Sequence, residues 1–270
     1  MKRLFFSLGV ILIGTFSLLP FLWFVLTSWK DPTEITAIPP QIIPSFHWGF
    51  YRSALDKYGL LGYIRNSAVV AGAATLISIA IGSLAAYALS RFHFSWSRLY
   101  LMLLLCVSMF PQIAIAGPVW RILNHLGWLN TYHGIVAAYI SLSLPLAIWI
   151  LTTFFKELPY EIEEAALVDG CTPLQALWKV VFPLAAPGIF TASILVFIHA
   201  WNEFFFALLI LTYPGLQTLP VGIALFPGEY TMPWGEIAAA STIATLPLIF
   251  LTLVFQRRIV RGLSAGAVKG

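Results

Sequence analysis

Six long apolar segments constrain this chain more than any other feature of its sequence. A helix that crosses a bilayer needs about 20 predominantly apolar residues. Only 10% of the residues are charged and the mean hydropathy is +0.88, whereas soluble proteins carry roughly 25% charged residues. The apolar segments lie at about 5–29, 67–90, 99–120, 135–155, 188–212 and 237–256. We therefore predict an all-α membrane protein whose six transmembrane helices form a single domain over residues 1–270.

The first segment also invites comparison with a cleaved signal peptide, because Lys2 and Arg3 precede it. However, the apolar run continues from Leu4 to Trp29. A signal-peptide core has ~7–15 residues and ends at an A-x-A-like site, which is missing here. We expect this segment to be retained as the first span.

The distribution of Lys and Arg predicts the orientation of the spans, since cytoplasmic loops are enriched in both. With the N-terminus in the cytoplasm, ten of the fifteen basic residues fall inside, and the opposite orientation inverts this bias. The inner residues are Lys2, Arg3, Arg91, Arg98, Lys156, Lys179, Arg257, Arg258, Arg261 and Lys269. We expect a multi-pass protein of the cell inner membrane with both termini in the cytoplasm.

The longest inner loop, residues 156–187, has the pattern of two short helices joined by a turn. Pro159 suits a first helical position, where its missing N–H is not needed. Three glutamates follow in the first turns, where carboxylates favour the positive end of the helix dipole. Gly170 fits a left-handed residue just past the helix end. Thr172 fits the N-cap of a second helix, which we expect to end at Pro183.

This hairpin is too polar at its tip to lie in lipid and too short to span the membrane. It could rest on the membrane surface as an amphipathic hairpin, or it could project and dock into a cytoplasmic partner. Five residues can line its apolar side: Ile162, Ala166, Leu174, Leu177 and Val181. The residues alone leave both interpretations open.

The same stretch resembles the EAA motif of binding-protein-dependent ABC importer permeases. That motif has E-A-A, a Gly four residues after the second Ala, an aliphatic residue ten further on, and then a hydrophobic-Pro pair. The matching residues are Glu164, Ala165, Ala166, Asp169, Gly170, Val180, Phe182, Pro183 and Pro187. Cys171 replaces the more usual Ala, and Phe182 stands where Leu is commoner. The resemblance implies a type I ABC importer permease fold, with residues 156–187 as the cytoplasmic coupling loop.

The resemblance also implies what the hairpin contacts, namely a cleft in an ATPase subunit. Glu164 would pair with a basic residue there, and Gly170 would let the backbone turn closely against the partner. The expected ATPase-coupling residues are Glu163, Glu164, Ala165, Ala166, Asp169, Gly170 and Pro183. The implied partners are a homologous second permease, two ATPase subunits, an extracytoplasmic solute-binding protein and membrane lipid.

The sequence contains no G-x-x-x-x-G-K-[ST] loop, which would cradle nucleotide phosphates. We therefore expect a non-catalytic transport subunit that binds no cofactor, with ATP and Mg held by the partner ATPase. No Cys and His spacing suggests a metal site. No basic cluster with interleaved aromatic residues suggests nucleic acid.

A polar group lies near the middle of the fifth segment. His199 and Glu203 are four residues apart and would share a helix face with Asn202. Ionisable groups cost ~2.5–3.5 kcal/mol at the bilayer centre, so these should face the bundle interior or a water-filled cavity. A structural hydrogen bond between helices and a place along the transport pathway are both open.

The run W-N-E-F at 201–204 resembles the fifth span of carbohydrate-importing permeases of the maltose type. The resemblance implies a sugar as the solute and half of a translocation pathway as the role of this chain. Two alternatives are an ABC permease for a non-sugar solute and a secondary transporter in which His199 and Glu203 relay protons.

The outer loop 213–236 resembles the loop of maltose-type permeases that reaches toward the solute-binding protein. On this resemblance, Gly228, Glu229 and Tyr230 are expected to face that protein. The alternative is a solvated connector.

The second segment carries a stripe of small residues at intervals of four: Ser78, Gly82, Ala86 and Ser90. Small side chains let another helix approach closely. We predict that a neighbouring helix packs along this stripe.

Overall fold

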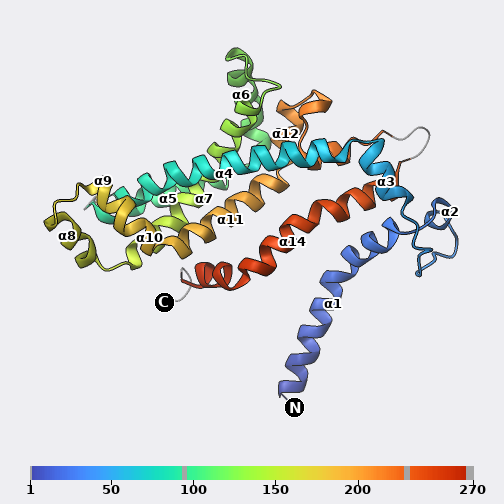
Figure 1. The fold of residues 1–270 in the computed structure, drawn as a ribbon, viewed down its shortest axis with the longest axis horizontal. Helices are drawn as coiled ribbons and strands as arrows, with labels where there is room; N and C mark the ends of the chain where they lie inside the picture. Colours follow the sequence, from blue (N-terminus) through green and yellow to red (C-terminus); the bar gives the residue numbers. More distant parts are fainter. Residues whose placement is uncertain (1, 93–95, 228–231, 266–270) are drawn as a thin grey trace. The chain divides into compact units, whose positions relative to one another are not determined.

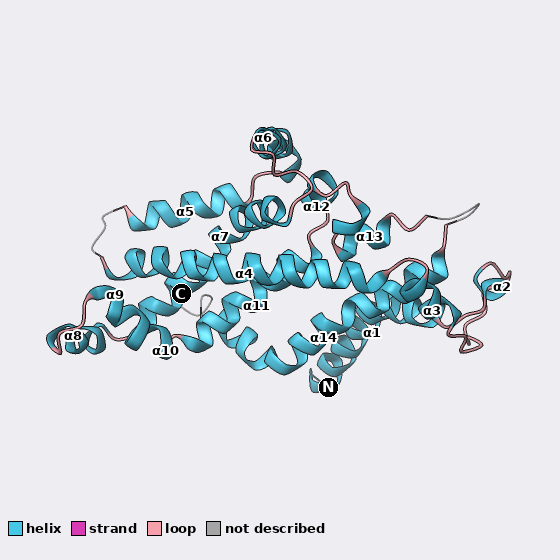
Figure 2. Cartoon of the chain, turned by 45° about the horizontal axis from the view of Figure 1, so that its top comes forward, coloured by secondary structure: helices cyan, strands magenta, loops and turns pink. Residues whose placement is uncertain are grey.

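The computed structural model describes residues 2–92, 96–227 and 232–265, which are helical and contain no strand (Figures 1 and 2). Among the described residues, four helices are long and apolar enough to cross a membrane, and the number is six if each of two bent helix pairs forms one span. The long helices are α1 (Lys2–Ser28), α4 (Leu60–Arg91), α7 (Tyr132–Glu157) and α14 (Trp234–Ala265). The predicted all-α membrane class is confirmed.

The third predicted span is broken rather than continuous. Helix α5 (Ser97–Ser108) and helix α6 (Gln112–His125) meet at 89°. Pro111 stands between them in an extended conformation, with φ −59° and ψ 123°. Proline lacks a backbone N–H and disfavours helical geometry in the preceding residue, so the helix ends although the apolar composition continues.

The fifth predicted span, at 188–212, is also broken. Helix α11 (Ala186–Asn202) ends at Asn202, and helix α12 (Phe205–Ile210) begins after Glu203 and Phe204. At its other end, α11 is separated only by Ala185 from the short helical arm Pro173–Leu184, and the two are bent by 82°.

Contacts divide the chain into two compact units. Unit 1 comprises Met1–Ile64 and Leu219–Leu248, and unit 2 comprises Arg65–Thr218 and Ile249–Gly270. Unit 1 includes the short helices α2 (Pro32–Ile35), α3 (Gly49–Asp56) and α13 (Leu219–Ala224). The single domain expected over 1–270 stays a prediction.

The core of unit 2 forms around helix α7. Its buried side chains come from α4, α7, the hairpin at 156–187 and α11: Ile79, Ala86, Tyr87, Ala147, Ile150, Leu151, Phe155, Leu177, Val181, Ala185, Ile189, Ala192 and Val196. A Cβ atom on Gly82 would lie 3.3 Å from the Cβ of Ala147, so α7 approaches α4 closely at this glycine. Ser78 and Ala86 are fully buried. Close packing along the small-residue stripe is therefore confirmed.

The described part of the segment 213–236, which we predict to be an outer loop, is packed against the protein. It contains a 3-10 turn, Pro214–Leu216, before α13. The Asn66 amide donates to the carbonyls of Gly215 and Gln217 at 3.0 and 2.9 Å. This part is therefore more than a solvated connector. Gly228, Glu229 and Tyr230 lie outside the described residues.

Candidate functional site

Residues 156–187, which we predict to be an inner loop, fold as the expected helix–turn–helix. Helix α8 (Tyr160–Val168) ends at Gly170, whose φ of +87° is the left-handed conformation expected there. Helix α9 (Pro173–Ala176) begins with a capping box, in which the Thr172 hydroxyl accepts from the amide of Gln175 and the Gln175 side chain accepts from the amide of Thr172. Both signals predicted from the sequence are confirmed.

Two predicted helix boundaries in the hairpin are wrong. Pro159 is the N-cap of α8 rather than its first helical residue. The second arm also continues past Pro183 as α10 (Phe182–Leu184), because a π turn at Leu177–Val181 precedes it. In this turn the amide of Phe182 bonds to the carbonyl of Leu177, five residues back. The wider hydrogen-bond spacing of the π turn accommodates Pro183, which has no N–H to donate.

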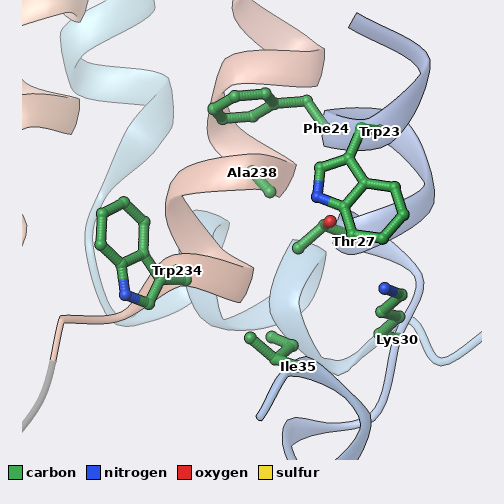
Figure 3. A pocket seen from close by; sticks show the side chains of 7 residues that line it. All are labelled: Trp23, Phe24, Thr27, Lys30, Ile35, Trp234 and Ala238. Carbon is green, nitrogen blue, oxygen red and sulfur yellow. The ribbon is translucent and has the colours of Figure 1, made fainter. Parts of the chain in front are cut away.

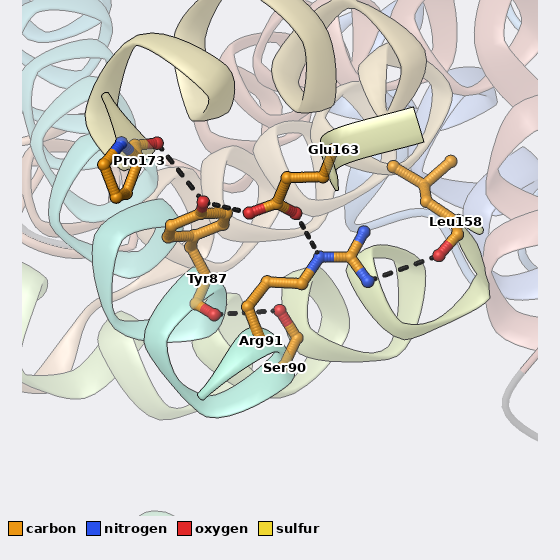
Figure 4. Close-up of polar contacts among 6 residues, drawn as sticks. All are labelled: Tyr87, Ser90, Arg91, Leu158, Glu163 and Pro173. Carbon is orange, nitrogen blue, oxygen red and sulfur yellow. Dashed lines mark hydrogen bonds and ion pairs between the residues drawn. The ribbon is translucent and has the colours of Figure 1, made fainter. Parts of the chain in front are cut away.

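A buried ion pair anchors the base of the hairpin (Figure 4). The Arg91 Nε atom lies 2.7 Å from a Glu163 carboxylate oxygen, and the two side chains are only 7% and 5% exposed. The Tyr87 hydroxyl donates to the other carboxylate oxygen and to the carbonyl of Pro173 at 3.2 Å. The Arg91 guanidinium also donates to the carbonyl of Leu158 at 3.3 Å.

These contacts tie three points of the hairpin to the end of α4. Leu158 precedes α8, Glu163 lies in its first turns and Pro173 begins α9. The charges are nearly removed from water, so removing either partner would leave the other buried and unpaired. The hairpin is therefore fixed at its base.

Sequence reasoning missed Tyr87 and Arg91 as parts of this site. Tyr87 and Glu163 are 76 residues apart, and no local spacing links them. The available signal was topological, since Arg91 ends a span on the side where the hairpin begins. A single sequence does not say which carboxylate the arginine meets.

The predicted coupling residues separate into inward-facing and exposed groups. Glu163 and Ala166 are buried, whereas Glu164, Ala165, Asp169, Gly170 and Pro183 are exposed. Of the five residues expected on the apolar side, Ala166, Leu177 and Val181 are buried, while Ile162 and Leu174 are exposed. Glu163 therefore acts within the chain, whereas Glu164 in the middle of α8 and Asp169 at its end lie on the exposed surface of the hairpin.

A second feature of unit 2 is an open groove of about 350 Å³ at the break in the fifth span. Its lining residues are Gln112, Ile198, His199, Asn202, Glu203, Phe204 and Phe205. Glu203 is extended and 7% exposed, and its carboxylate accepts from the amides of Phe206 and Ala207 at 2.8 and 3.0 Å. It therefore caps the first turn of α12.

The expectation that His199 and Glu203 share a helix face is wrong, because α11 ends at Asn202. His199 and Asn202 are exposed along the groove. The Asn202 amide donates to the carbonyl of Ile198 at 2.9 Å. The Tyr139 hydroxyl of α7 donates to the backbone carbonyl of Glu203 at 3.2 Å. The groove residues thus have different roles, with Glu203 holding the break and His199 facing the open space.

Across the part of the chain that the structure describes, no group of three or more His, Cys, Asp or Glu side chains could hold a metal ion.

Comparisons with known proteins identify close relatives of the chain. A family model described as binding-protein-dependent transport system inner membrane component matches residues 78–265. The chain is 41% identical to the trehalose/maltose transport system permease protein MalG of Thermococcus litoralis, over 100% of this chain and 98% of the relative. It is 40% identical to the sulfoquinovosyl glycerol transport system permease protein SmoH of Agrobacterium fabrum, over 98% of this chain and 93% of the relative.

A solved structure of a bacterial ABC transporter shares the fold. A chain of a bacterial ABC transporter involved in the import of the acidic polysaccharide alginate superposes with a TM-score of 0.77. The match covers 95% of this chain and 96% of the other, at 23% sequence identity.

Proposed function

The chain belongs to the family of binding-protein-dependent transport system inner membrane components and is a multi-pass membrane protein, and on that premise we propose that it is the permease subunit of an ATP-driven sugar importer. Two of its relatives are named for different carbohydrate solutes and are nearly equally similar to it. This similarity supports carbohydrates as the solute class without selecting one sugar. The chain would pair with a second, homologous permease to form the pathway.

The anchored hairpin is the observation that carries this proposal. A loop can transmit a displacement only if its base is fixed, and the buried Arg91–Glu163 pair fixes it. The exposed residues Glu164 and Asp169 of the hairpin would then contact an ATPase subunit on the cytoplasmic side. ATP and Mg would bind that subunit, and the nucleotide must favour one arrangement of the complex over the other to drive a change.

The groove at 198–205 is our candidate for part of the solute path. His199 and Asn202 offer polar groups to sugar hydroxyls, while Phe204 and Phe205 offer aromatic surface. The exposed polar residues stand beside a break in the span, a feature of membrane proteins that is tolerated where it lines a cavity. An extracytoplasmic solute-binding protein would deliver the sugar, and both termini would be cytoplasmic.

Reconstitution of the purified complex tests this proposal. We expect sugar uptake into liposomes that requires ATP, both permeases, the ATPase and the binding protein. Glu164→Lys should abolish uptake and weaken retention of the ATPase, because it reverses the charge of an exposed residue on the surface of the hairpin that would contact the ATPase. Glu157→Lys, at an exposed position that ends α7, is the matched control and should transport normally.

Two results would contradict the proposal at different levels. Uptake by this chain alone, without nucleotide, would identify a secondary transporter. ATP-dependent uptake with a binding protein that retains only a non-sugar solute would overturn the solute class but keep the permease role.

A further inference from the structure

A cavity of about 270 Å³ lies within unit 1, far in sequence from the coupling hairpin (Figure 3). Its lining residues come from α1 and the segment after it, from α2 and from the start of α14: Trp23, Phe24, Thr27, Lys30, Ile35, Trp234 and Ala238. Aromatic and aliphatic side chains form most of the wall. Lys30 is the one charged residue among these seven.

Lys30 is buried without an acidic partner. It is 2% exposed, and its ammonium lies 4.2 Å from the ring centroid of Trp23. Within the described ranges, the Lys30 ammonium makes no hydrogen bond and no ion pair. The buried Thr27 hydroxyl likewise has no hydrogen-bond partner. A cation–π contact offsets only part of the cost of desolvating a charge. The cavity therefore offers two unmet polar groups.

The nearest carboxylates in the sequence are engaged elsewhere. Asp31 accepts from the amide and the hydroxyl of Thr33 at 3.1 and 2.8 Å. Glu34 accepts from the amide of Asp31 at 2.9 Å and from Ser45 at 3.2 Å. These bonds form the capping box of α2 and hold the backbone next to Lys30 in place. Neither carboxylate therefore forms an ion pair with the Lys30 ammonium.

The cavity lies where two candidate spans meet the same boundary of the membrane. Lys30 follows the span Phe5–Ser28 by two residues, and Trp234 is the first residue of the span Trp234–Gln256. Tryptophan is enriched at the level of the lipid head groups. A ligand that enters from this boundary brings a polar head beside a hydrocarbon tail.

We propose that this cavity binds the head group of an anionic phospholipid. The Lys30 ammonium and the Thr27 hydroxyl donate to the phosphate oxygens, and the ester region of the lipid lies against Trp23 and Phe24. The acyl chains extend from the cavity into the membrane beside α1, whose most hydropathic window has no residue buried within this chain. The seven lining residues include no carboxylate to meet the ammonium of a zwitterionic head group. This site does not depend on which solute the protein transports.

Lipid binding to the full-length, delipidated protein in mild detergent tests the site, with native mass spectrometry as the readout. We expect wild type to retain dioleoylphosphatidylglycerol in preference to dioleoylphosphatidylethanolamine. Lys30→Met should weaken retention of the anionic lipid about tenfold or more, as expected for a lost hydrogen bond to a charged group. Lys57→Met is the matched control, because Lys57 is an exposed lysine of the same unit whose ammonium also lies over an aromatic ring, that of Tyr58.

Thermal unfolding separates loss of binding from loss of folding. Without lipid, Lys30→Met should be at least as stable as wild type, because the substitution removes a charge that has no acidic partner in the cavity wall. Added anionic lipid should raise the melting temperature of wild type and Lys57→Met but not that of Lys30→Met. Equal lipid retention by Lys30→Met, equal retention of both lipids by wild type, or displacement of the lipid by millimolar inorganic phosphate would each overturn the proposal.

Discussion

Glu163→Gln is the substitution that most directly tests whether the coupling hairpin is fixed at its base. The change keeps the size of the side chain and one acceptor oxygen, but it removes the negative charge that Arg91 meets at 2.7 Å. The guanidinium then stays buried, since its side chain is only 7% exposed in wild type. The hydrogen bond from Tyr87 can persist to the amide oxygen.

The expected cost follows from this geometry. Removing one partner of a buried ion pair costs about 3–5 kcal/mol. The retained acceptor keeps part of that interaction, so we expect a loss of about 2–3 kcal/mol, comparable to one hydrogen bond to a charged group. The opening equilibrium of the hairpin should then rise about 30- to 140-fold, at 1.4 kcal/mol per factor of ten.

Amide hydrogen exchange measures this opening. In Glu163→Gln, the amides of α8 and α9 should exchange faster, while those in the middle of α7 should keep their wild-type rates. Glu164→Gln is the matched control, because it removes the same charge from the adjacent, exposed residue. It should leave exchange unchanged and affect only the association with an ATPase.

A double-mutant cycle decides whether the effect belongs to the pair. If Arg91→Leu and Glu163→Leu are combined, the loss should be smaller than the sum of the two single losses. Additive losses, or exchange in Glu163→Gln that matches Glu164→Gln, would refute the claim that this ion pair anchors the hairpin.

Three further predictions concern a left-handed glycine, a close helix contact and the pH dependence of a helix cap. Gly170→Ala imposes a side chain on a left-handed residue that has open space around it, so the hairpin should open more readily by about 1 kcal/mol; Gly215→Ala, where φ is not positive, should have no such effect in the same exchange experiment. Gly188→Ala sets a methyl group against the ring of Phe154 and should cost about 1–3 kcal/mol in thermal stability, and Phe154→Leu should recover part of that loss. Hydrogen bonds from Thr33, the backbone amide first, hold the pKa of Asp31 below its usual 3.8. The contribution of Asp31 to α2 is therefore complete above that pH and is lost as the pH falls through the lower folded-state value. Because acid also slows the intrinsic exchange of every amide, the measurement is the protection factor at 32–36, which should fall on acidification in wild type but not in Asp31→Asn.

Local chemistry made the hairpin predictable from the sequence. Gly170, Thr172 and Pro173 each act on the backbone within a few residues, so their effects need no knowledge of the rest of the fold. The same holds for the small-residue stripe on α4, because its spacing alone places it on one helix face. The apolar segments were predictable because bilayer thickness sets the length of a spanning helix.

The features that sequence reasoning missed depend on contacts between residues far apart in the sequence, or on whether a polar side chain continues a helix or caps the next one. Apolar residues continue on both sides of Asn202 and Glu203, so these two polar residues were the only local sign of a break, and the Glu203 carboxylate is the one that caps the new helix. The pairing of Glu163 with Arg91 depends on where α4 ends in space. Nothing local distinguishes Glu163 from its neighbour Glu164.

The 82° bend at Ala185 has a mechanical consequence for the groove. Helical hydrogen bonds reach Ala185 from both sides, since its amide donates to the carbonyl of Val181 at 2.8 Å and its carbonyl accepts from the amide of Ile189 at 2.9 Å. Ala185 is therefore the single residue that joins the two arms, with no longer linker between them. Helix α11 has 17 residues, and at 1.5 Å per residue it is about 25 Å long. If the arms turn together, a rotation of about 5° at Ala185 moves Asn202 by about 2 Å, by the same 1.5 Å rise per residue. A small tilt of the hairpin would thus change the width of the groove by a distance comparable to the radius of a hydroxyl group.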